Sequence, residues 1–174
     1  MNAVARNRRW GLLGLIVVCF LSIPLHFFYD WTGENTFIGL FAPINESIWE
    51  HLKLVFWPLL VWWTVGFIFY KKEGLSFNKW FTAAAAAIFL SMFVIVAWYY
   101  IWKGALAVES TAVGLSALFI AVPIGQLVAI HVYRVITPRT LYMVLALLFI
   151  AVTGAAFIGF TLAPPDFPIF MPPN

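Results

Sequence analysis

The sequence predicts an all-α integral membrane protein, a bundle of five transmembrane helices with its N-terminus in the cytoplasm. Composition is the first reason: the 174 residues are 64% hydrophobic and only 10% charged, whereas soluble domains are about half apolar and a quarter charged. The second reason is the length of the apolar stretches, about 20 residues each, which a helix needs to cross a bilayer. These stretches fill nearly all of the chain, so we expect residues 1–174 to form a single transmembrane domain.

Each apolar stretch is assigned to one helix. The first follows Arg6, Arg8 and Arg9 and so resembles a signal peptide, but bulky aromatic residues stand where a signal peptidase needs small ones. We therefore expect it to remain as an anchor. The predicted helices cover about residues 10–28, 45–70, 80–102, 111–133 and 141–162, and a proline-rich tail covers 163–174. The tail is too short and too rich in proline to cross the membrane again.

The charged residues predict the orientation, because cytoplasmic loops carry an excess of Lys and Arg. One side of the predicted bundle holds Arg6, Arg8, Arg9, Lys71, Lys72, Lys79, Arg134 and Arg139. The opposite, outer side holds Asp30, Glu34, Glu46, Glu50, Glu109 and Asp166. Because the basic residues are spread over loops rather than gathered in a patch, the net charge of +3 indicates a topology signal and argues against a nucleic-acid partner. The single cysteine, Cys19, excludes an intramolecular disulfide and a Cys-rich metal cage.

Ionisable residues gather at the outer ends of the first two predicted helices, where burial makes them costly and therefore a hint of function. His26 and Asp30 are four residues apart, and so are Glu46 and Glu50, which places each pair on one helix face. His51 follows Glu50 directly. Because a short loop joins the two helices, both groups should lie at the same depth. Further polar residues that could approach are Lys53, Glu109 and Asp166.

Three interpretations of this cluster stay open. In the structural one, Asn45 caps the second helix, Glu50 pairs with Lys53, and His26 with Asp30 closes a contact between helices. In the second, two histidines and several carboxylates on facing helices bind zinc or another divalent ion, although no HExxH spacing makes the signal specific. In the third, Glu50 and His51 relay protons in a small transporter.

If the protein is an enzyme, the expected class is a metal-dependent hydrolase or transferase that acts on a lipid or lipid-linked substrate. His26, Asp30 and His51 are then the metal ligands, Glu50 is the general base, and Glu46 is a second catalytic carboxylate. The alternatives are a transporter and an accessory subunit that works by helix packing. The sequence does not choose between an enzyme and these alternatives.

Two further features bear on partners and on the extent of the site. His131 falls near the inner end of the fourth predicted helix, so we expect it to lie apart from the other two histidines. Small residues recur at four-residue spacing in two helices, which is typical of close helix packing within one chain or in a homo-oligomer. They are Ala83, Ala87 and Ser91 in the third helix, and Ala151, Ala155 and Gly159 in the fifth.

The stretch LFAPINESIWEHLKLVFWP, with HFFYDWTG before it and PPDFPIF near the end, resembles a family of small bacterial multi-pass membrane proteins of unknown function. The shared pattern falls on His26, Pro43, Asn45, Glu46, Ser47, Trp49, Glu50, His51, Leu52, Lys53 and Pro58, and then on Pro164, Pro165, Asp166, Pro168, Ile169 and Phe170. The resemblance implies that the protein lies in a bacterial cytoplasmic membrane, in contact with membrane lipid. It implies no activity. Its pattern coincides with the outer polar cluster.

The orientation can be tested with a reporter enzyme that is active only outside the cytoplasm. We expect activity when the reporter follows Asn174 and none when it is inserted in residues 71–79, because the lysines of that loop should hold it inside. An active fusion in the lysine loop would invert the bundle and place the acidic cluster in the cytoplasm.

Overall fold

The protein is helical throughout the part that the computed structural model describes, residues 2–106 and 111–172, and those residues include no strand. Five helices are long and apolar enough to cross a membrane. They are α1 (Ala3–Trp31), α3 (Ile48–Tyr70), α4 (Phe77–Tyr99), α5 (Thr111–Val135) and α6 (Thr140–Leu162). The short elements are α2 (Thr36–Gly39), η1 (Lys71–Glu73), the π-helical turn η2 (Tyr100–Ala105) and η3 (Pro168–Phe170). The predicted all-α, five-helix membrane fold is confirmed.

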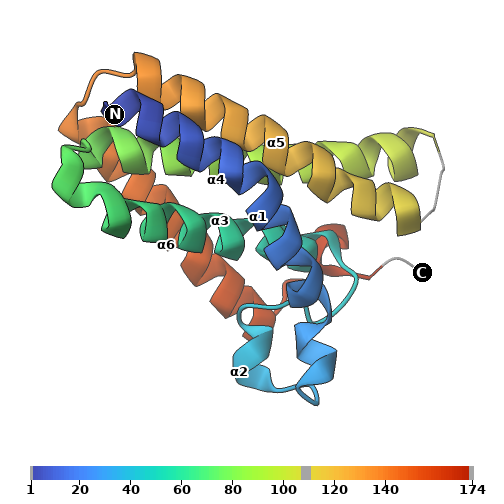
Figure 1. The fold of residues 1–174 in the computed structure, drawn as a ribbon. Coiled ribbons are helices and arrows are strands. Elements are labelled where there is room, and N and C mark those ends of the chain that lie inside the picture. Colours follow the sequence, from blue (N-terminus) through green and yellow to red (C-terminus); the bar gives the residue numbers. More distant parts are fainter. Residues whose placement is uncertain (1, 107–110, 173–174) are drawn as a thin grey trace.

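Helix α4 occupies the centre of the bundle, where it packs against α3, α5 and α6, while α1 lies against α3 and α5 (Figure 1). Helix α6 contacts chiefly α4. In its most apolar window only 17% of the residues are buried, compared with 50% in α3. Most of the α6 surface therefore lies on the outside of the bundle.

Helix α1 is longer than predicted at both ends. It begins at Ala3 because the side chain of Asn2 accepts a hydrogen bond of 2.9 Å from the backbone N–H of Ala5, which caps the first turn. Its 29 residues span about 43 Å at helical rise, whereas the hydrocarbon core is about 30 Å thick. Helix α1 is thus longer than the hydrocarbon core is thick, and near its N-terminus Arg6 forms an ion pair of 2.6 Å with Glu73.

Helix α3 begins later than predicted, at Ile48 rather than near residue 45. Its N-cap is Ser47, whose hydroxyl oxygen accepts a hydrogen bond from the backbone N–H of Glu50 at 3.3 Å. The expected cap, Asn45, instead accepts a hydrogen bond from the N–H of Ser47 at 2.9 Å and so forms a tight turn just before the helix. Glu46 therefore lies on a loop and does not share a helix face with Glu50.

The two stripes of small residues have different surroundings. In α4 the side chains of Ala83, Ala87 and Ser91 are fully buried, and the Ser91 hydroxyl donates a hydrogen bond of 3.1 Å to the carbonyl of Ala121 in α5. A Cβ atom on Gly125 would collide with the Ser91 hydroxyl and the carbonyl oxygen of Ala87. This stripe is thus an intramolecular contact. The α6 stripe of Ala151, Ala155 and Gly159 is exposed.

The α4–α5 contact gives a prediction with a control in the same chain. Gly125→Ala should lower the stability of the bundle by about 1–3 kcal/mol, because an added methyl group overpacks the helix contact. Gly159→Ala meets no atom within 4 Å and should be neutral or stabilise by up to about 1 kcal/mol through helix propensity. Thermal unfolding in detergent measures both. Equal effects of the two changes would contradict the assignment of this face.

Candidate metal centre

A buried ion pair shapes the chain just before the site. The ammonium group of Lys53 is fully buried and donates hydrogen bonds to Glu50 Oε2 at 2.6 Å, to the Thr161 hydroxyl at 2.6 Å and to the carbonyl of Gly39 at 2.7 Å. Glu50 Oε2 also accepts a hydrogen bond from the backbone N–H of Ile44 at 2.9 Å. Glu50 is thus held by Lys53 and the loop, as the structural interpretation of this residue predicts.

Three other side chains converge beside this pair. His26 comes from α1, His51 from the first turns of α3, and Glu46 from the loop between α2 and α3, at the end of the bundle where α2 lies (Figure 1). The Nε2 atoms of the two histidines are 3.2 Å apart. Glu46 Oε2 lies 3.3 Å from His51 Nε2, and Glu46 Oε1 lies 3.9 Å from His26 Nε2. One potential ligand atom from each of the three residues lies within 4.8 Å of the other two.

The ring of His51 is oriented by the loop. Its Nδ1 atom lies 2.8 Å from the carbonyl oxygen of Ser47. A carbonyl only accepts hydrogen bonds, so Nδ1 carries a hydrogen and Nε2 is the nitrogen that faces His26 and Glu46. When the ring is protonated, Nε2 donates a hydrogen bond to the Glu46 carboxylate, and when the ring is neutral, Nε2 offers its lone pair. Metal-binding histidines are commonly fixed by such a backbone contact on the second nitrogen. In His26 the Nδ1 atom is buried without a hydrogen-bond partner among the described residues.

The distance between the two histidine nitrogens suits a small divalent ion. Two nitrogens bound to tetrahedral zinc at about 2.05 Å are about 3.3 Å apart, close to the observed 3.2 Å. The side chains of His26 and His51 are only 17% and 28% exposed, whereas that of Glu46 is 64% exposed. Three such side chains with one open side would leave a bound zinc ion a fourth position for water or substrate, as in catalytic rather than structural zinc sites.

Glu46 is held in the charge state that a metal needs. The hydrogen bond with His51 is the main cause that holds the pKa of Glu46 below its usual value, and it outweighs the opposing effect of partial burial. Glu46 is therefore a carboxylate at neutral pH. The two histidine nitrogens lie within hydrogen-bond distance of each other, so one proton can bridge them and a metal ion can take the place of that proton.

The structure brings together only part of the predicted ligand set. His26 and His51 meet as predicted, but Asp30 is exposed and does not belong to the group, in which Glu46 takes its place. The reason is the late start of α3, which leaves Glu46 on a loop that bends back over the histidines. Asp166 is exposed beyond α6, and Glu109 lies outside the described residues.

His131 lies apart from the other two histidines. Helices α1 and α5 are antiparallel neighbours, since Gly11 faces Ile130 and Gly14 faces Gln126. His131 is therefore level with the beginning of α1, and the 15 or so residues between that level and His26 correspond to about 22 Å along the helix.

Five apolar helices with a His–Glu–His cluster at one end define a multi-pass membrane protein that carries a candidate metal centre. The chain belongs to the family described as "Family of unknown function (DUF6512)", whose profile matches residues 1–173. Comparison with curated proteins and with solved structures finds no match. Membership in a family of unknown function agrees with the resemblance in the sequence, while the signature residues and a bacterial origin stay predictions.

The buried pair predicts a specific pattern of stabilities. Glu50→Gln or Lys53→Met alone should destabilise the protein by about 3–5 kcal/mol, because each leaves the other charge buried without its partner. The double variant should recover most of the loss, since two neutral groups need no compensating charge. Thermal unfolding of the two single variants and the double variant in detergent measures this. A double variant as unstable as the worse single one would show that the pair is not self-contained.

Proposed function

We propose that the protein is a membrane metalloprotein that binds one divalent ion, best matched by zinc, through His26, Glu46 and His51. The observation that carries this proposal is the convergence of two histidine Nε2 atoms and a carboxylate, with the His51 ring fixed from behind by the Ser47 carbonyl. Two nitrogens and one carboxylate oxygen form a ligand set that zinc accepts readily.

The reaction class that this site supports best is metal-assisted hydrolysis or group transfer. Zinc with an open position polarises an ester or phosphoryl oxygen and lowers the pKa of water. Of the carboxylates considered for the base, Glu50 is 3% exposed and engaged with Lys53. Asp30 is exposed and lies one helical turn beyond His26 on α1, so it is the better candidate for the general base.

A lipid-type substrate fits the depth of the site. About 20 residues of helix cross the hydrocarbon core, so a span of α1 that begins near Trp10 reaches the outer boundary near Asp30. His26 then lies at the level where lipid head groups meet the acyl chains. Phe27, Phe28 and Trp31 are exposed beside it, as is typical of aromatic residues at the membrane interface. In a bacterial cytoplasmic membrane, the site would face the periplasmic leaflet.

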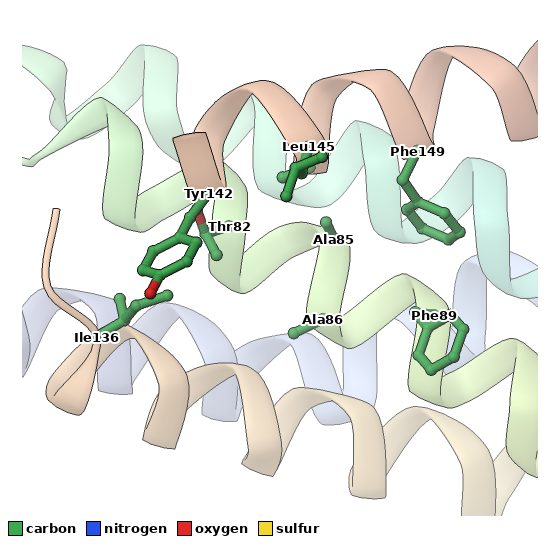
Figure 2. Close-up of a pocket in the computed structure, with 9 residues that line it drawn as sticks. Thr82, Ala85, Ala86, Phe89, Ile136, Tyr142, Leu145 and Phe149 are labelled. Carbon is green, nitrogen blue, oxygen red and sulfur yellow. The ribbon is translucent and has the colours of Figure 1, made fainter. Parts of the chain in front are cut away.

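The two alternative functions receive less support. A proton or ion relay is favoured by the short distance between His26 and His51. However, a shallow groove of about 290 Å³ between α4 and α6 is lined by apolar side chains such as Leu145 and Phe149, which offer no ligand to an ion (Figure 2). An accessory role in a homo-oligomer is favoured by the exposed small residues of α6.

Metal content tests the proposal. The purified protein should carry about one zinc per chain, and His26→Ala or His51→Ala should remove most of it, because each supplies a ligand nitrogen. His131→Ala is the matched control and should keep the metal. Elemental analysis after exhaustive dialysis gives the answer. A parent protein that does not bind zinc, or zinc that is lost on His131→Ala, would overturn the assignment.

A further inference from the structure

Lys53 and Glu50 bind backbone groups of the preceding loop as well as each other. We call this pair, with the loop groups that it binds, the clamp. Besides Glu50, the ammonium group contacts the carbonyl oxygens of Gly39 at 2.7 Å and Ala42 at 3.4 Å. Glu50 in turn holds the backbone N–H of Ile44 at 2.9 Å. Backbone groups on both sides of residues 40–43 are thus bound to one buried charge pair, which fixes this stretch on the surface of α3.

Glu46 lies only two residues beyond the last point of this clamp. Its side chain is largely exposed, and its ion-pair partners are the two site histidines. Glu46 lies outside any helix, so the backbone on each side must determine where its carboxylate lies. The clamp fixes that backbone before Glu46 at Ile44, and the turn from Asn45 to Ser47 fixes it afterwards.

The clamp also reaches the last membrane helix. The Thr161 hydroxyl of α6 donates to its own helix at the carbonyl of Phe157 and accepts the hydrogen bond from Lys53 at 2.6 Å. Just beyond, the ring of Phe170 packs on Trp49 of α3, with centroids 5.0 Å apart. The end of α6 and the tail are therefore docked on the same turn of α3 that carries His51.

Stability alone is a weak reason for a buried charge pair at this position. Replacing a buried ion pair by neutral side chains of similar size is often neutral or stabilising. This pair binds loop carbonyls, a loop N–H and a hydroxyl of α6, and so it holds these segments in one defined arrangement. Its effect should therefore appear in the position of Glu46, which lies on that loop.

We propose that Lys53 and Glu50 are positioning residues of the metal centre, which hold Glu46 against the two histidines and make this ligand depend on the docking of α6 through Thr161. The inference rests on the proposed metal binding. It assigns no contact between the pair and the metal or substrate: the pair acts only through the loop.

The test is a thermodynamic cycle for zinc affinity, measured by titration against a competing chelator. The combined change Glu50→Gln with Lys53→Met should weaken zinc binding about tenfold or more, as loss of supporting residues around a metal site commonly does. Glu46→Ala should weaken it at least as much. When Glu46→Ala is already present, the combined change should have no further effect, because the ligand that it positions is gone.

Two further measurements keep the test independent of overall stability. Cobalt(II) in the site should show the intense visible absorption of four-coordinate geometry in the parent, and the combined change should alter that spectrum in the same way as Glu46→Ala. Thr161→Val should weaken zinc binding several-fold because it removes one partner of Lys53. Thr153→Val is the control, since it makes the same change on α6 more than two turns earlier.

The outcomes separate this inference from the proposed function. A parent that binds no zinc overturns both. Zinc binding that is unchanged by the combined change, or additive losses in the cycle, overturns the positioning role and leaves the metal centre intact. If the combined variant does not fold, unchanged affinity and an unchanged cobalt spectrum in Thr161→Val overturn it equally.

Discussion

A charge buried next to the hydrocarbon region of a membrane must find all its partners within the protein. In this bundle the buried charge is the ammonium group of Lys53. Its ammonium group is fully buried at the end of the bundle, where lipid offers no hydrogen bonds and an unpaired charge would be very costly. Glu50, two loop carbonyls and a hydroxyl from α6 satisfy it. The loop, the first turns of α3 and the end of α6 are arranged around this one nitrogen atom.

The rest of the bundle provides a rigid frame for that end. Helices α4 and α5 approach closely because Gly125 has no side chain to separate them and Ser91 binds across the contact. In lipid such close packing replaces the hydrophobic effect as the main attraction between helices. Helix α1 lies on this frame through close contacts at Gly11 and Gly14. The histidine that α1 carries is thereby placed opposite the one on α3.

The fold was largely predictable, because a bilayer demands long apolar helices and the sequence supplies them. The meeting of His26 and His51 was also predictable, since two helices joined by a short loop bring their facing ends to one depth. The presence of Glu46 rather than Asp30 beside the two histidines was not predictable. It depends on the start of α3 at Ile48, and several residues before Ile48 were suitable caps. Thr161 carried no signal that sequence spacing could detect, since its partner is 108 positions away.

The position of Thr161 has a consequence for how the protein is made. Chains emerge from the ribosome with the N-terminal part first, so α1 and α3 enter the membrane while α6 is still unmade. During that interval both histidines are already present, but the ammonium group of Lys53 lacks one of its partners. This end of the bundle can therefore reach its final arrangement only after α6 has been synthesised and has docked on α3.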